Sequence, residues 1–148
     1  MTDEIFQITK NKYHLPIDLK NVTRVQADSI AHVGELINSI DYDAPEGTKI
    51  LAALDGVVLA IKNDSDRGGL DQSFEDDGNY IEILHDNGEV SEYEHLKQYS
   101  VCVKIGDHVK TGQKVAEVGN TGWSECSHLH FMVYPKNSPY QTLKINFY

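Results

Sequence analysis

The sequence predicts an all-β protein, built from antiparallel sheets of short strands. Apolar runs are short, and turns rich in Gly, Asp and Asn separate them. Two of these turns, Asp55-Gly56 and Asn87-Gly88, favour tight hairpins because these residue pairs tolerate positive φ angles. Helical periodicity is nearly absent. A chain of 148 residues is most simply one domain that can bury a core without disulfides.

Composition and charge narrow the functional classes. The chain is 40% hydrophobic and 24% charged, as is typical of globular proteins, and its net charge is −10. An acidic chain is not expected to bind nucleic acid or anionic membranes non-specifically. No apolar stretch is long enough to span a membrane. The two cysteines, Cys102 and Cys126, are expected to be free thiols, and the alternative for Cys126 is a metal ligand or a redox switch.

The N-terminus carries no visible export signal. Met1-Thr2-Asp3-Glu4 is acidic, and no apolar run follows it. Residues 1–12 are polar and are expected to form a loose lead-in, so that the predicted domain spans residues 13–148.

The predicted strands follow from short apolar or alternating runs between turns. In chain order they are residues 21–29, 39–42, 49–54, 57–61, 79–86, 89–96, 100–105, 114–118 and 128–134. Residues 30–38 are predicted to be a loop, and residues 135–148 a polar turn region. The polar stretch 63–78 is long enough to suggest a functional loop.

The Asn87-Gly88 turn predicts which residues share a face. A two-residue turn pairs Asp86 with Glu89 and, counting back, Tyr80 with His95. Directly paired residues lie on the same face, so His95 is expected beside Tyr80. His85 then lies on the opposite face and outside any site that contains His95.

A loop rich in Gly and Asn leads into a strand with two histidines. Side chains two residues apart on a strand share a face, so His128 and His130 are expected together on one exposed face. Leu129 and Phe131 point the other way, into the core. Imidazole is the commonest metal ligand, which favours a metal site. The alternative is a surface strand that merely holds two histidines.

Five blocks of the sequence occur together in one order. They are His32 followed by Ile40-Asp41-Tyr42, then Tyr93-Glu94-His95-Leu96, Gly106-Asp107-His108-Val109 with Gly112-Gln113, Gly119-Asn120-Thr121-Gly122, and His128-Leu129-His130-Phe131. In this order they resemble the lysostaphin/LytM-type zinc endopeptidases, which cut peptidoglycan peptides. The resemblance covers roughly residues 13–135. It implies a lysostaphin-like half-barrel, known as the duplicated hybrid motif.

The resemblance also implies a site. It makes His32, Asp41 and His130 the ligands of one Zn²⁺, and His95 and His128 the catalytic pair. Two histidines and a carboxylate leave a tetrahedral zinc open to water, whose pKa the metal lowers to roughly 7. No His-Glu-x-x-His helix supplies a glutamate base, so histidines near the metal must do that work.

Two departures from the family pattern stand out. The commonest form places the first ligand histidine four residues before the aspartate, where this chain has Ile37. His32 is the expected ligand from a longer loop, and His14 is the alternative. The usual Gly-Pro before His-x-His is replaced by Cys126-Ser127.

Two other functions stay open at this point. One is a catalytically silent relative that binds peptidoglycan or a partner protein. The other is a carrier module, because residues 105–113 resemble the turn of lipoyl- and biotinyl-type barrels. A carrier has no use for Asp41, His128 and His130 together, and no exposed hairpin lysine stands out.

The substrate is expected to depend on two loops beside the groove, residues 64–77 and 120–127. The first is acidic, which predicts a preference for a peptide with a free amine. The resemblance implies a peptidoglycan peptide as partner and a place in the cell envelope or outside the cell. No wall-binding domain fits in this length, and we expect a monomer.

Overall fold

The computed structural model describes residues 7–27, 37–139 and 141–148. These residues form strands and short 3-10 turns, and no α-helix occurs among them, which confirms the all-β prediction. The strands are β1 Ile8–Tyr13, β2 Arg24–Gln26, β3 Ile40–Asp43, β4 Lys49–Leu51, β5 Gly56–Lys62, β6 Gly68–Gly69, β7 Tyr80–Leu84, β8 Glu89–Glu94, β9 His108–Val109, β10 Lys114–Glu117, β11 Gly122–Trp123, β12 His128–Pro135 and β13 Lys144–Phe147. The 3-10 turns are η1 Leu19–Asn21, η3 Gln72–Asp77 and η4 Asp86–Gly88. Within the described ranges, no helix has the length and apolarity that crossing a membrane requires.

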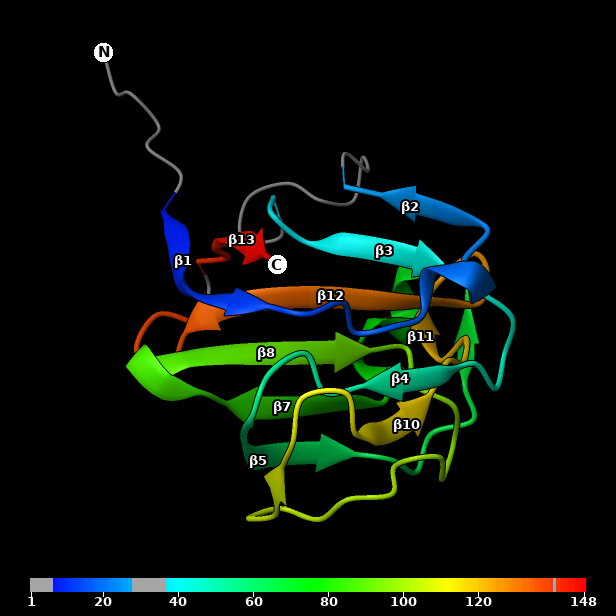
Figure 1. Ribbon diagram of the computed structural model, residues 1–148. Coiled ribbons are helices and arrows are strands. Elements are labelled where there is room, and N and C mark those ends of the chain that lie inside the picture. The colour runs from blue at the N-terminus through cyan, green and yellow to red at the C-terminus, as the bar shows by residue number, and fades with distance from the viewer. Residues whose placement is uncertain (1–6, 28–36, 140) are drawn as a thin grey trace.

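One large antiparallel sheet organises the molecule. Its seven strands run in the order β2-β3-β12-β8-β7-β5-β9 across the described residues, and Figure 1 shows β3, β12, β8, β7 and β5 side by side. β12 lies between β3 and β8 and is the longest strand of this sheet. Side chains on β12 therefore have neighbours on both sides.

The main core lies between one face of this sheet and the pair formed by β4 and β10. Leu129 and Phe131 of β12 are fully buried there, as the alternation predicts. Ile50 of β4 and Val115 of β10 belong to the same apolar cluster. The other face of β12 is thus left for its two histidines.

The turn between β7 and β8 has one residue more than predicted. Leu84 pairs with Val90 and Tyr80 pairs with Glu94, so the predicted pairing of Tyr80 with His95 is wrong by one residue. Asn87 and Gly88 do adopt positive φ angles, of 63° and 67°. The loop, however, comprises three residues, Asp86–Gly88, because the hydrogen bond that closes it runs from the His85 amide to the Glu89 carbonyl.

The predicted hairpin around Asp55-Gly56 does not form. β4 pairs with β10, whereas β5 pairs with β7 and β9. The glycine is needed for close packing and not for a turn, because a Cβ at Gly56 would clash with the carbonyl oxygen of Leu84. The chain thus crosses from one layer to the other at this point.

The ordered part begins earlier than predicted. Residues 8–12, expected to be a loose lead-in, belong to β1, which pairs in parallel with β13. The carboxylate of Glu89 accepts hydrogen bonds from the amides of Lys10 and Asn11, at 2.7 and 3.2 Å. Strand β13 itself lies in the region predicted to be turns. The division of the chain into a lead-in and a domain stays a prediction.

The strand predicted at residues 100–105 is also absent from the described structure. The amide of Cys102 still donates to the carbonyl of Val115 at 3.0 Å. The apolar run therefore did not produce a strand with a continuous ladder of hydrogen bonds.

Candidate metal and catalytic site

Three strands place the site's side chains in one row on the face opposite the core. In the sheet register, Asp41 of β3 lies opposite His130 of β12, which in turn lies opposite Glu94 of β8. Two residues along, on the same face, Asp43 lies opposite His128. Antiparallel register thus brings together residues that are far apart in the sequence.

His130 lies between two carboxylates. Its Nδ1 is 2.9 Å from Oδ1 of Asp41, and its Nε2 is 3.6 Å from Oε2 of Glu94. Burial lowers the pKa of His130, but the hydrogen bond to Asp41 and the charge of Glu94 outweigh it, so that the pKa lies above its ordinary value. The imidazole is buried, not exposed as the sequence predicted.

His128 is held by the loop that precedes β12. Its Nδ1 is 2.8 Å from the carbonyl oxygen of Cys126 and 3.1 Å from Oγ of Ser124. A carbonyl can only accept, so Nδ1 carries the ring proton. Nε2 is then the acceptor nitrogen of the neutral ring, and it lies 3.8 Å from Oδ1 of Asp41.

His95 follows β8 directly and is held in the same way. Its Nδ1 is 2.6 Å from the carbonyl oxygen of Thr121, so Nδ1 again donates and Nε2 is the acceptor. Burial, together with the nearby imidazoles of His128 and His130, lowers the pKa of His95 to about 3. The residue has a φ of 68°, in the left-handed region that non-glycine residues rarely adopt.

The two imidazoles of His95 and His128 lie side by side. Their ring centroids are 4.4 Å apart, and the centroids of His95 and His130 are 6.0 Å apart. Because both Nδ1 atoms bond to carbonyl oxygens of the loop 120–127, both rings present Nε2 as a proton acceptor. The arrangement can therefore accept a proton from a group bound beside Asp41.

The donor set suits a zinc ion. Nδ1 of His130 and Oδ1 of Asp41 are a nitrogen and an oxygen of the types that zinc prefers, and they already face each other. The third predicted ligand, His32, lies outside the described residues. The alternative ligand His14 stacks on Tyr148, with ring centroids 4.3 Å apart.

Two further histidines lie outside the site, and for His85 this was predicted. His85 lies outside the site and contacts the Asp55 carbonyl through Nδ1 and Oγ of Ser91 through Nε2, both at 2.7 Å. His108 is exposed on β9. Tyr93 is fully buried in the core, where its hydroxyl accepts the amide proton of Ala53 at 2.9 Å.

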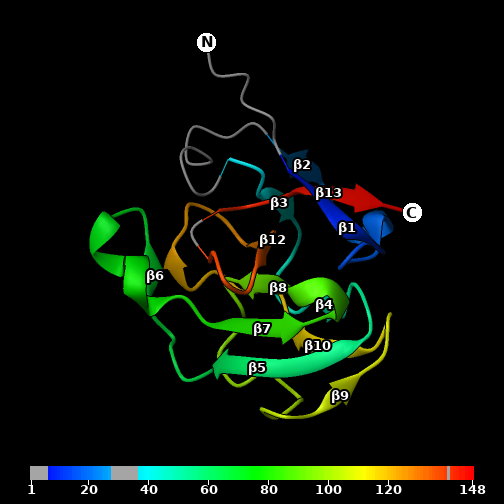
Figure 2. The same cartoon turned by 90° about the vertical axis from the view of Figure 1, so that its left-hand side faces the viewer.

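The two predicted groove loops are joined to each other. β6 in the first loop pairs with β11 in the second, with Gly68 opposite Gly122 and Gly69 opposite Trp123. The indole of Trp123 donates to the carbonyl of Leu70 at 2.9 Å. In Figure 2, β6 and the turn that follows it form a projection at one side of the molecule.

Sequence reasoning missed the contribution of Glu94. It lies inside the Tyr93-Glu94-His95 block, but the register predicted for this hairpin was wrong by one residue and placed Tyr80 beside His95. With the correct three-residue turn, the alternation of β8 turns Glu94 toward the metal face and Tyr93 into the core. The loop length was therefore the missing information.

Comparisons with known proteins agree with this geometry. The peptidoglycan DD-endopeptidase ShyA of Vibrio cholerae is 32% identical over 109 residues, which are 74% of this chain and 23% of ShyA. A zinc-containing peptidase from Vibrio cholerae superposes with a TM-score of 0.64 at 26% identity, over 90% of this chain and 39% of that one. The catalytic domain of lysostaphin from Staphylococcus simulans gives 0.53 at 28% identity, over 66% of both chains.

The matches cover only part of each relative, but they identify the fold and the family. The chain spans less than a quarter of the length of the curated relatives that it matches. The lysostaphin-like fold expected from the five sequence blocks is confirmed. The profile of Peptidase family M23 matches residues 35–142, which is most of the chain. The chain therefore belongs to Peptidase family M23.

Proposed function

We propose that this domain is a zinc-dependent endopeptidase that hydrolyses amide bonds in peptidoglycan peptides. The observation that carries the proposal is the gathering of Asp41, His130, His128 and His95 on the face of the sheet opposite the core. The printed name of ShyA, a peptidoglycan DD-endopeptidase, supports the same substrate class. A silent binding module would have no need for two imidazoles with matched tautomers beside a carboxylate and histidine pair.

The proposed zinc ligands are His32, Asp41 and His130. The zinc-containing relative from Vibrio cholerae supports this choice of metal. When bound, zinc polarises the scissile carbonyl and makes a water molecule acidic enough to attack at neutral pH. Without a metal, the 2.9 Å contact between Oδ1 of Asp41 and Nδ1 of His130 already places the two ligand atoms face to face.

His128 and His95 are the proposed catalytic pair. Each ring donates its Nδ1 proton to a carbonyl of the loop 120–127, so each offers Nε2 as an acceptor to the attacking water. The low pKa of His95 keeps that ring neutral and makes it a weak base, so His128 is proposed to take the proton. The protonated Nε2 can then donate a hydrogen bond to the developing oxyanion.

The decisive experiment is elemental analysis of the purified protein. Zinc should be present in the wild type and lost in His32→Ala, Asp41→Ala and His130→Ala. His108→Ala is the matched control, because His108 is exposed on β9 and should leave the metal content unchanged. His95→Ala and His128→Ala should keep zinc and lose cleavage of purified peptidoglycan. A wild type that takes up no zinc, even when zinc is supplied, would make the silent binding module the better account.

We also propose that the acidic loop 64–77 selects peptides with a free amine near the scissile bond. Part of its charge is already compensated, because Asp64 lies 3.2 Å from Lys62 and Asp77 lies 3.4 Å from Arg67. The exposed carboxylates Asp66, Asp71 and Asp76 are better placed to meet a substrate. Changing these three to Asn should weaken binding of a lysine-containing stem peptide but not of its acetylated form. Equal affinities for the two peptides would contradict the idea.

The domain is further proposed to act as a monomer, since no step of the chemistry above needs a second copy. Sedimentation at two protein concentrations, with and without zinc, tests this.

A further inference from the structure

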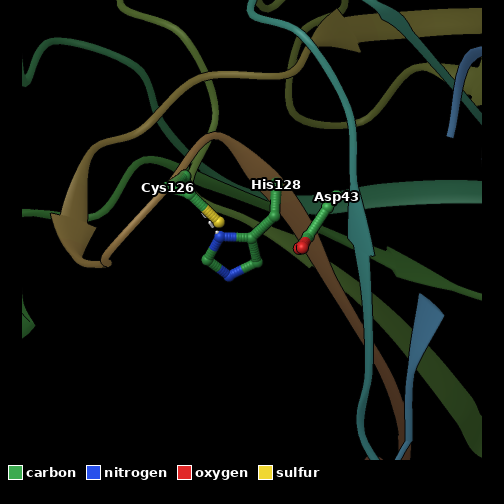
Figure 3. A group of neighbouring side chains, drawn as sticks. All are labelled: Asp43, Cys126 and His128. Atoms are coloured by element: carbon green, nitrogen blue, oxygen red, sulfur yellow. Dashed lines mark hydrogen bonds between the residues drawn. The ribbon is translucent and has the colours of Figure 1, made fainter. Parts of the chain in front are cut away.

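A second group of metal-binding side chains lies beside the proposed catalytic site. Asp43, Cys126 and His128 each offer one ligand atom, and these atoms lie within 4.8 Å of one another in the part of the chain that the structure describes. Figure 3 shows the three side chains pointing toward one another, from β3, from the loop before β12 and from the start of β12. Thiolate, imidazole and carboxylate together are a donor set that suits zinc and softer divalent ions.

This group is distinct from the pair formed by Asp41 and His130. The two groups occupy neighbouring rows of the sheet, with Asp41 opposite His130 and Asp43 opposite His128. His128 stands between them and turns a different nitrogen to each side. Nε2 faces Asp41 at 3.8 Å, whereas Nδ1 faces the backbone of Cys126 at 2.8 Å.

The surroundings allow an ion to enter from solvent. Cys126 is exposed, Asp43 is half-buried and His128 is buried, so the three residues lead from the surface inward. The cysteine stands where the sequence pattern of the family has Gly-Pro, so this thiol is a feature of this chain. The other exposed cysteine, Cys102, instead contacts the carbonyl of Lys114 through its sulfur, at 3.4 Å.

We propose that Asp43, Cys126 and His128 form a second, inhibitory binding site for a thiophilic divalent cation such as excess Zn²⁺ or Cd²⁺. The inference deepens the proposed function and rests on it for its inhibitory effect. An ion held by the sulfur of Cys126 takes the lone pair of Nδ1 of His128. The proton of Nδ1 moves to Nε2, and the thiol proton leaves to solvent. Nε2 then carries a hydrogen and can no longer accept one from water.

The test titrates Cd²⁺ and Zn²⁺ into protein that already holds one zinc per chain. The wild type should bind a further ion and gain the ultraviolet sulfur-to-cadmium charge-transfer band. Cys126→Ser and Asp43→Asn should lose the further ion, and Cys126→Ser should also lose the band. Cys102→Ser, the matched control with the other exposed thiol, should behave as the wild type. Peptidase activity, normalised to that of the same variant with one zinc, should fall with excess zinc in the wild type and stay level in Cys126→Ser.

The outcomes separate this inference from the proposed function. A band that persists in Cys126→Ser, or a wild type that binds no ion beyond the first, would overturn the second site. Equal inhibition of the wild type and Cys126→Ser by excess zinc would overturn its inhibitory role. A wild type that fails to hold the first zinc, but still forms the cadmium band through Cys126, would reject the peptidase proposal and retain the second site.

Discussion

We infer that Glu94 sets the orientation of the proposed ligand His130. Without a metal, Nδ1 of His130 lies in hydrogen-bond contact with Asp41. A metal at this position needs the lone pair of Nδ1, so the ring must carry its proton on Nε2. The carboxylate of Glu94 lies 3.6 Å from Nε2 and is the group expected to stabilise this tautomer by its charge. Carboxylates commonly play this part beside histidines that bind metals.

We therefore expect Glu94→Leu to weaken zinc binding by about tenfold. Glu94→Gln should weaken it less, because its side-chain carbonyl can still accept a hydrogen bond from Nε2. Competition with a chromophoric chelator measures the affinity directly, whatever the peptidase activity. Glu46→Leu is the control, since Glu46 is exposed. Equal zinc affinities for Glu94→Leu and the control would show that Glu94 has no part in positioning His130.

The raised pKa of Glu92 should make the stability of the fold depend on pH. Burial and the nearby charges of Glu94 and Glu82 raise its pKa from 4.5 to about 10. The folded protein thus keeps this proton at pH values where the unfolded chain has lost it. The stability that results is complete below about pH 4.5 and is lost as the pH rises toward 10.

Glu92→Gln, which mimics the protonated acid, should therefore raise the melting temperature at pH 8 by several degrees and change it little at pH 4. Thermal unfolding with a chelator present measures this without a contribution from bound metal. Glu46→Gln, at an exposed position, should have no effect at either pH. A Glu92→Gln protein that is less stable than the wild type at pH 8 would mean that Glu92 is ionised in the fold.

At the scale of the elements, a comparison of two glycines distinguishes the cost of backbone strain from the cost of steric crowding. Gly122 of β11 and Gly112 have nearly the same φ, 84° and 83°. A Cβ on Gly122 would lie 2.8 Å from Cα of Gly78 and 3.3 Å from Nδ1 of His95, whereas a Cβ on Gly112 would have nothing within 4 Å.

Gly112→Ala should cost about 1 kcal/mol of unfolding free energy, from the left-handed backbone alone. Gly122→Ala should cost about 3 kcal/mol, because crowding is added to the same strain. Urea unfolding measures both values. Gly122→Ala should also lower kcat, since the neighbouring residue Thr121 carries the carbonyl that holds His95. Equal costs for the two variants would mean that the neighbours of Gly122 move aside freely.

The sequence predicted those features that depend on the residue pattern within one strand. Alternation in His128-Leu129-His130-Phe131 correctly assigned Leu129 and Phe131 to the core and the two histidines to the opposite face. Pairing was harder, because it depends on contacts between distant segments. Asp55-Gly56 had the composition of a hairpin, yet β4 pairs with β10, which lies about sixty residues further along the chain. Burial of the two histidines was missed for the same reason, since part of their cover comes from His95 and the loop 120–127.

At the scale of the whole molecule, Glu89 joins the N-terminal strand to the large sheet. Its carboxylate is buried and accepts hydrogen bonds from the amides of Lys10 and Asn11 and from the hydroxyl of Tyr13. β1 in turn carries β13, the last strand of the chain. This one side chain therefore helps to attach both ends of the described chain to the β7–β8 turn.

Glu89→Ala should lower the unfolding free energy by about 3 kcal/mol, because a buried hydroxyl and two amides lose a charged acceptor. The amides of β1 should also exchange their hydrogens faster than those of β12. Urea unfolding and hydrogen exchange measure the two effects. Glu46→Ala serves as the exposed control, and matching losses of stability in both variants would contradict the role given to Glu89.

The pairing of β6 with β11 has a consequence for how this domain could change over evolution or by design. The loop expected to choose the substrate is hydrogen-bonded to the segment whose Thr121 carbonyl sets the tautomer of His95. Grafting residues 64–77 from a relative, without residues 120–127, would disturb the proton acceptor together with the groove. New specificities should therefore be reached by exchanging the two loops as one unit, and a library that varies only one of them should return mostly slow enzymes.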